Sequence, residues 1–164
     1  MIKTERLVLR PLEEGDLGRI TELLQDEEIH KYMERVPYPY SREDAEALLR
    51  HDRRERDAHH MVITLDGEVV GRVSLMRIFR GRAQLGYWLG KAYWGRGIMT
   101  EAVRGMLNHY SGEIDLVVTY VAVPNRASQR VLEKTGFRRV AMLPRYHRNF
   151  NGEVNDAYLY LRHL

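Results

Sequence analysis

The sequence contains no cysteine, and this absence removes several kinds of chemistry. Disulfide bonds, metal sites built from thiolates and a covalent cysteine nucleophile are all excluded. The seven histidines include no His-Glu-x-x-His spacing, so the sequence predicts no metal site. Neighbouring His59 and His60 are expected to point to opposite faces of a strand.

Long hydrophobic runs are also missing. No stretch approaches the roughly 18 apolar residues of a membrane span, and the opening MIKTERLVLRPL lacks the apolar centre of a signal peptide. We therefore expect no membrane partner and a cytoplasmic location. Residues 61–164 carry 15 Lys and Arg against 8 Asp and Glu, a balance that suits a polyphosphorylated cofactor or nucleic acid. Because no aromatic RNA-binding signature accompanies this charge, no nucleic-acid partner is expected.

What remains is the composition of an ordinary globular protein. Of the 164 residues, 44% are hydrophobic and 30% are charged, far from the extremes of disordered and membrane proteins. A chain of this length buries a core without needing a metal or a disulfide. We expect one domain over residues 1–164.

The hydrophobic spacing predicts a mixed sheet covered by helices. Asp66-Gly67 is the strongest local signal, because this dipeptide suits the tight turn of a hairpin. Apolar residues three and four apart predict four helices, over 13–24, from Ser41, over 99–110 and over 125–135. Seven strands are expected, at 7–10, 61–65, 68–75, 83–90, 115–121, 138–143 and 157–161. The order βααβββαβαββ needs at least one parallel pair in a mostly antiparallel sheet of the α+β type.

A glycine-containing turn, Gly95-Arg96-Gly97, leads from the strand at 83–90 into the helix at 99–110. Glycine lets the backbone approach a phosphate, and a helix N-terminus offers unpaired N–H groups and a positive dipole end. The turn therefore predicts an anion site. It is not a Walker loop, which needs Gly-Lys-Ser/Thr, nor a dinucleotide fingerprint, which needs a third glycine where this chain has Thr100.

The surrounding segment LGYWLGKAYWGRGIMTEAV resembles the acetyl-CoA loop of the GNAT superfamily of N-acyltransferases. TERLVLRPL, PYSREDAEALL, GEVVGRVSL, VPNRASQRVLEKTGF and NGEVNDAYLYL are similar, in the same order, to the branch of the ribosomal-protein N-terminal acetyltransferases RimJ and RimL. The resemblance implies the GNAT fold, with strands 83–90 and 115–121 splayed apart around the pantetheine of acetyl-CoA. It also implies acetyl transfer to an amine, by direct attack because cysteine is absent.

The same resemblance implies a set of cofactor-binding residues, with the pyrophosphate held by backbone N–H groups of the loop. The family has Gln or Arg where this chain has Trp94, and Gly or Ala where it has Met99. Met99 either narrows the loop or belongs to the apolar face of the helix. The residues expected to bind acetyl-CoA are Leu89, Trp94, Gly95, Arg96, Gly97, Met99, Thr100, Asn125, Ser128 and Arg130.

For catalysis, the resemblance implies roles for Leu89, Ser128 and the position of Gln84. A backbone N–H near Leu89–Gly90 would polarise the thioester carbonyl, and the Ser128 hydroxyl would protonate the departing thiolate. Ser128 has an alternative interpretation, because after Pro124 it could close a first helical turn that is capped by Asn125.

Many relatives carry a glutamate at the position of Gln84, and this carboxylate is often proposed as the general base. The amide of Gln84 cannot accept a proton. The alternatives are His30, Glu34 or a water chain as the base, an acceptor that arrives partly neutral, or a catalytically weak protein that only binds acyl-CoA.

Tyrosines are expected around the acceptor, because aromatic loops can embrace a peptide terminus or a cation. The candidates are Tyr32, Tyr38, Tyr40, Tyr87 and Tyr146, whereas Trp88 is expected in the core. A terminal amine has a pKa of about 8 and a lysine about 10.4, so a terminal amine is the easier nucleophile. A protein N-terminal α-amine is the predicted acceptor, with a polyamine, amino acid or antibiotic as the alternative. The chain is expected to be a monomer or homodimer.

Overall fold

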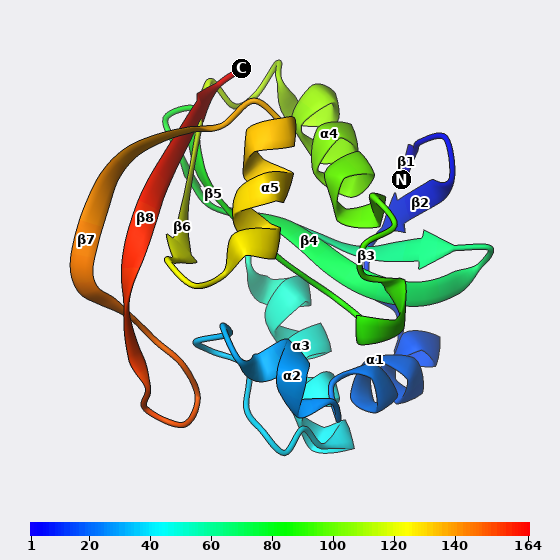
Figure 1. Cartoon of the computed structure of the whole chain (residues 1–164). Helices are drawn as coiled ribbons and strands as arrows, with labels where there is room; N and C mark the ends of the chain where they lie inside the picture. Colours follow the sequence, from blue (N-terminus) through cyan, green and yellow to red (C-terminus); the bar gives the residue numbers. More distant parts are fainter.

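Strands with alternating or continuous apolar residues build one eight-stranded sheet in this computed structural model, which describes residues 1–164. The order across the sheet is β1-β2-β3-β4-β5-β6-β8-β7 (Figure 1). All neighbours are antiparallel except β5 and β6. The strands are β1 (Ile2–Lys3), β2 (Leu7–Arg10), β3 (His59–Leu65), β4 (Glu68–Phe79), β5 (Arg82–Leu89), β6 (Leu116–Ala122), β7 (Arg138–Arg148) and β8 (Val154–His163).

Helices cover both faces of the sheet. One face packs against α4 (Ile98–Tyr110) and α5 (Arg126–Lys134), and the other against α1 (Leu17–Leu23), the single turn α2 (Glu27–His30) and α3 (Arg42–Arg54) (Figure 1). Two 3-10 turns, Glu14–Asp16 and Lys91–Tyr93, complete the list. None of the helices has the length and hydrophobicity needed to cross a membrane.

The core lies in two layers because successive strand residues point to opposite faces. In β3, Met61 and Ile63 join the larger cluster under α4, whereas Val62 joins the smaller cluster under α1 and α3. Trp88 is buried in the smaller cluster, as expected for a core residue. Strands buried on both faces explain the continuous apolar runs of the sequence.

The structure confirms the predicted mixed α+β architecture and adds two short elements. Asp66 and Gly67 have the positive φ values, 52° and 85°, that the hairpin turn requires. Ser41 caps α3 by accepting a hydrogen bond from the backbone of Asp44. The sequence prediction omitted β1 and α2, since two and four residues are too few to show a periodicity.

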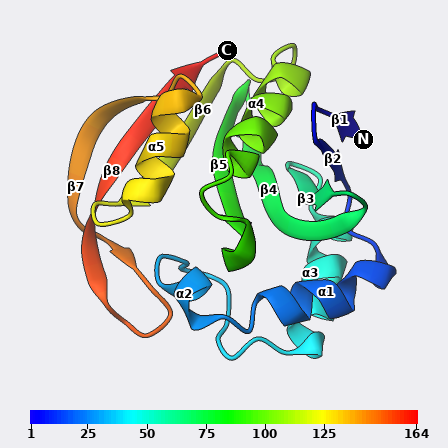
Figure 2. The ribbon, with the colours of Figure 1, turned by 45° about the vertical axis from the view of Figure 1, so that its right-hand side comes forward.

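The parallel pair β5–β6 opens into a fork. The two strands pair only from Arg82↔Leu116 to Gln84↔Val118, although β5 continues to Leu89 and β6 to Ala122 (Figure 2). The hydroxyl of Thr119 donates to the carbonyl of Leu85 at 3.0 Å, just beyond the last pair. The predicted splaying of these strands is confirmed, and it leaves a gap inside the sheet.

Candidate active site

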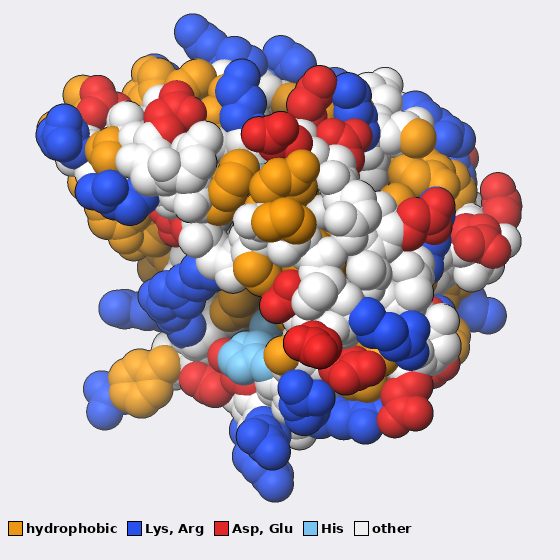
Figure 3. Space-filling model, turned by 90° about the horizontal axis from the view of Figure 1, so that it is seen from below, with side chains coloured by type: hydrophobic (Ala, Val, Ile, Leu, Met, Phe, Trp, Pro, Cys, Tyr) orange, Lys and Arg blue, Asp and Glu red, His pale blue; other side chains and the backbone are white.

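A cavity of about 1370 Å³ occupies the fork and is lined by residues from both faces of the sheet. Its size exceeds the roughly 300–1,000 Å³ of a pocket for one drug-sized ligand, so two substrates fit together. Asn125 and Ser128 line it on the α5 side, and Tyr32, Met33 and Trp88 on the side of α1 to α3. Seen from below, the surface is hollowed on one side, with charges of both signs around the hollow (Figure 3).

The open end of the fork is bridged by a strap, residues 31–40 of the loop after α2. His147 Nε2 donates to the Tyr32 carbonyl at 2.9 Å, and Asn149 Nδ2 donates to the Lys31 carbonyl at 3.2 Å. The carboxylate of Glu34 lies 4.0 Å from His147 Nε2. The strap therefore ties the N-terminal half of the sheet to the end of β7.

The glycine-containing turn before α4 presents free donors. Gly95 and Gly97 both have φ of 73°, and the first N–H of this segment with a protein acceptor is that of Glu101, bound to the Gly97 carbonyl at 3.0 Å. The backbone N–H groups of residues 95–100 thus have no acceptor in the protein, and Gly95, Gly97, Met99 and Thr100 line the cavity. A row of free N–H groups at the start of a 13-residue helix is suited to a polyphosphate.

Two side chains, those of Trp94 and Arg6, hold this turn in place through contacts that the sequence did not reveal. Trp94 Nε1 donates to the Leu89 carbonyl at 2.8 Å, which fastens the loop to β5. Arg6 Nη1 donates to the Arg96 carbonyl at 3.0 Å, while Arg6 Nε pairs with Glu101 at 2.7 Å. Arg6 and Arg96 lie 90 positions apart in the sequence, so no local pattern could predict the hydrogen bond between them.

Of the two predicted oxyanion donors, the N–H groups of Leu89 and Gly90, the structure leaves that of Leu89 available. Gly90 N–H donates to the Val70 carbonyl at 2.8 Å and is therefore occupied within the sheet. Because N–H directions alternate along an antiparallel strand, those of Leu89 and Tyr87 point away from β4. They face the gap where β6 no longer pairs with β5.

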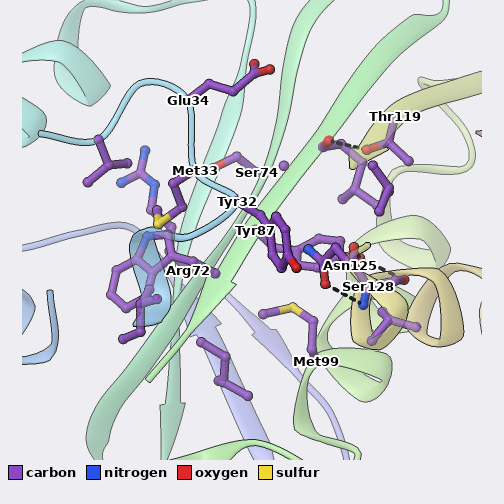
Figure 4. Close-up of a pocket in the computed structure, with 18 of the residues that line it drawn as sticks. Tyr32, Met33, Glu34, Arg72, Ser74, Tyr87, Met99, Thr119, Asn125 and Ser128 are labelled. Atoms are coloured by element: carbon purple, nitrogen blue, oxygen red, sulfur yellow. Dashed lines mark hydrogen bonds between the residues drawn. The ribbon is translucent and has the colours of Figure 1, made fainter. Parts of the chain in front are cut away.

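Ser128 forms a hydrogen-bonded pair with Tyr87. Their hydroxyl oxygens are 2.7 Å apart, and both residues line the cavity (Figure 4). The capping alternative for Ser128 applies only to its backbone, whose N–H donates to Asn125 Oδ1 at 3.2 Å. Burial raises the pKa of the Tyr87 hydroxyl to about 12, although the bond to Ser128 opposes the rise. Tyr87 therefore stays protonated at neutral pH and can act as a donor.

The remaining predicted residues line the cavity, except Arg96 and Tyr38. Gln84, Tyr32, Tyr40, Tyr146 and Arg130 line the cavity, and Tyr146 stacks on Tyr120 with ring centroids 4.8 Å apart.

The prediction that Tyr38 contacts the acceptor is wrong. Its ring packs against His30 and Phe150, at 4.8 and 5.2 Å between centroids, and does not line the cavity. His30 itself is fully buried and donates from Nε2 to the Leu24 carbonyl, so it cannot serve as a base for a substrate. Met99 is buried in the larger core cluster and also touches the cavity, which combines both interpretations of this residue.

Comparison with known proteins gives consistent matches. A family model described as "Acetyltransferase (GNAT) domain" matches residues 6–138. The probable N-acetyltransferase YjcK of Bacillus subtilis (strain 168) is 38% identical over 109 residues, or 63% of this chain. The ribosomal-protein-serine acetyltransferase of Escherichia coli (strain K12) is 31% identical over 109 residues, or 64% of this chain. Each match spans 60% of the length of the relative.

Among solved structures, the microcin C7 self-immunity acetyltransferase MccE, in complex with acetyl-CoA and AMP, has a similar fold. The TM-score is 0.87 at 22% identity, with 98% of this chain and 93% of that chain covered.

Proposed function

The chain belongs to the GNAT acetyltransferase family, and on this premise we propose that it transfers an acetyl group from acetyl-CoA to a protein N-terminal α-amine. The observation that carries the proposal is the β5–β6 fork, which opens beside six consecutive free N–H groups at residues 95–100. Pantetheine enters the fork like an added strand, and the pyrophosphate accepts from the N–H groups before α4.

The chemistry follows from the groups that face the gap. The amine nitrogen attacks the thioester carbon, and the Leu89 N–H stabilises the negative charge that develops on the carbonyl oxygen. The carbon–sulfur bond then breaks, and the Ser128 hydroxyl gives its proton to the departing thiolate. Tyr87, 2.7 Å from Ser128, returns a proton to the serine and is itself reprotonated by the proton that the attacking nitrogen loses. Asn125 and Arg130 contact the cofactor from α5.

The acceptor approaches from the face of the sheet opposite α4 and α5, where Tyr32, Tyr40 and Tyr146 line the cavity. A terminal amine, with a pKa of about 8, needs the least assistance to become neutral. The Escherichia coli relative carries a ribosomal-protein substrate in its name, which supports the same acceptor class. The strap over the cavity favours a second candidate, a slender small-molecule amine, because it limits the width of what can enter.

An acceptor panel tests this function. The enzyme is incubated with acetyl-CoA and, separately, with peptides bearing a free α-amine, the same peptides with an acetylated N-terminus and an internal lysine, spermidine, and single amino acids. We expect CoA release with the free α-amine peptides, and mass spectrometry should place the acetyl group on the terminus. Release with spermidine or amino acids alone would support the small-molecule candidate, and no release with any amine would contradict the proposed function.

Replacing Gln84 by glutamate should change the pH profile. Gln84→Glu places a proton acceptor where relatives carry one, so kcat/KM should rise, about tenfold, mainly at low pH where the amine is largely protonated. The rise should vanish as the pH passes the pKa of the amine, because deprotonation is then no longer needed. Asn108→Asp, an added carboxylate on the exposed side of α4, is the control and should leave the profile unchanged. An unaltered profile in Gln84→Glu would show that this position does not limit proton transfer.

A further inference from the structure

A chain of hydrogen bonds leaves the acceptor side of the cavity and ends at the protein surface. Ser74 Oγ lies 2.9 Å from His60 Nδ1, and His60 Nε2 lies 2.7 Å from Glu55 Oε2. The same carboxylate oxygen is 2.7 Å from His51 Nε2, and the side chain of His51 is 61% exposed. Ser74 and His60 line the cavity, whereas the His60 side chain is only 5% exposed.

The hydrogen-bond pattern fixes which groups donate. A carboxylate only accepts, so His60 Nε2 must carry the proton that bonds to Glu55. In a neutral imidazole Nδ1 is then an acceptor, and the hydroxyl of Ser74 must donate to it. The lone pairs of Ser74 Oγ remain available to a group in the cavity. The arrangement is that of a hydroxyl backed by an imidazole and a carboxylate.

Ser74 is well placed to meet the acceptor. It pairs across the sheet with Gly86, and the next pair on the same face is Met76↔Gln84, the position where relatives carry a base. Gly86 has no side chain to cover Ser74, and a Cβ there would lie 2.8 Å from Met76 Cε. Figure 4 shows Ser74 on the side of Met33 and Arg72, and Ser128 on the opposite side of the cavity.

The surroundings of His60 keep its imidazole uncharged, so that Nδ1 has a free lone pair to accept a proton. Its titratable neighbours are His51 and Asp52 of α3, the latter at 4.0 Å, and Glu55, which directly follows α3. Its charged neighbour from β4 is Arg72. Burial and the positive charge of Arg72 lower the pKa of His60 below its usual range, against the opposing carboxylates. Arg72 itself is held by two hydrogen bonds to Asp52, at 2.6 and 2.7 Å. At neutral pH His60 is therefore an uncharged imidazole.

We propose that Ser74, His60 and Glu55 form the proton relay that deprotonates the acceptor amine in place of the carboxylate absent at Gln84. The inference rests on the proposed function. The ammonium gives one proton to Ser74 Oγ while the Ser74 proton moves to His60 Nδ1, which leaves a neutral amine, an intact serine and an imidazolium beside the Glu55 carboxylate. The imidazolium later releases its proton to water through the Glu55–His51 end of the chain.

The test compares pH profiles of kcat/KM for His60→Gln and Ser74→Ala, with a free α-amine peptide as the acceptor. Both variants should lose roughly tenfold in kcat/KM at pH 7, because only about a tenth of an amine with a pKa near 8 is neutral there. The loss should shrink to under about threefold above pH 9, where the amine is neutral without help. The matched control is His59→Gln, on the same strand but on the opposite face, where His59 bonds to Glu113 at 3.0 Å and stacks on Tyr110. This control should keep the wild-type profile.

A structural role predicts a different result. If the cluster only holds α3 to β3, the variants should lose thermal stability and show an activity loss that is equal at all pH values. That outcome, or activity that requires added Zn²⁺ bound between His51, Glu55 and His60, whose ligand atoms lie within 4.8 Å of one another, would overturn the relay.

A measurement without turnover separates the relay from the function. NMR of the imidazole nitrogens should show His60 neutral at pH 7, protonated at Nε2, with a pKa below the usual range of histidine. A charged or Nδ1-protonated His60 would overturn the relay even in an active enzyme. Absence of turnover on every amine would instead contradict the proposed function.

Discussion

Replacing Gly97 by valine is expected to abolish acetyl-CoA binding in a protein that still folds. Gly97 has φ of 73°, a conformation that a β-branched residue adopts only with strain on the order of 1–3 kcal/mol. The nearest protein atom to an added Cβ would be Arg6 Nη2 at 3.6 Å, so the protein itself has room for the side chain. The valine would instead occupy the space through which phosphate oxygens reach the N–H groups of residues 95–100.

The measurement is the melting temperature with and without acetyl-CoA. At a concentration of 100 times its Kd, the ligand should stabilise the wild type by about 2.7 kcal/mol, a shift of about 5–10 °C. Gly97→Val should show a shift of no more than about 1–2 °C, which corresponds to binding at least about 100-fold weaker. Gly67→Val is the matched control, since Gly67 also has positive φ, 85°, but lies in the β3–β4 turn with no atom within 4 Å. An undiminished shift in Gly97→Val would contradict the assignment of the phosphate site.

Ser128→Ala is expected to lower kcat by 10²- to 10⁴-fold with little change in acetyl-CoA affinity, the range typical of a lost general acid. The Ser128 hydroxyl makes no capping bond, so its removal should leave the melting temperature nearly unchanged. Tyr87→Phe should lower kcat less, because the serine retains its own proton. Since the two hydroxyls act in sequence, the double variant should be no slower than Ser128→Ala alone.

The control for this series is Thr135→Val, at the end of α5. The Thr135 hydroxyl donates to the carbonyls of Val131 and Leu132, so its loss should cost about 1 kcal/mol of stability without affecting kcat. A larger loss in Tyr87→Phe than in Ser128→Ala would make Tyr87 the direct proton donor. Full activity in both variants would remove this pair from the mechanism.

Local signals predicted much of this fold. The Asp66-Gly67 turn, the Ser41 cap of α3 and the apolar face of α4 each depend on residues within a few positions of one another. The resemblance to a family, and not periodicity, led to the expected opening between strands 83–90 and 115–121. Pairing that ends after Gln84↔Val118 has no signature within either strand, because both continue with residues that are mostly apolar or aromatic, over 85–89 and 119–122.

Contacts between segments that are far apart in the sequence could not be predicted from it. Tyr38 looked like a substrate residue in a tyrosine-rich loop, but Phe150, more than 100 positions away, covers its ring. The alternation rule correctly sent His59 and His60 to opposite faces. It could not show that His60 would meet Ser74 and Glu55, because the register between β3 and β4 decides the first contact and the end of α3 decides the second.

The strap turns the fork into a ring. Three contacts close the border of the gap. Lys91, just after β5, pairs with Glu28 of α2 at 2.8 Å, and the Tyr32 carbonyl accepts from His147 of β7. Val123 N–H, just after β6, donates to the Asp156 carbonyl of β8 at 2.9 Å, so the border runs without a break from β5 to β6. The enclosed gap in the sheet therefore has two openings, one on each face. The proposed acetyl-CoA occupies the opening beside α5 and the acceptor amine occupies the opposite one, so neither substrate blocks the entry of the other. CoA and the acetylated amine can each leave through the opening by which acetyl-CoA or the amine entered. The fold therefore imposes no fixed order of substrate binding or product release.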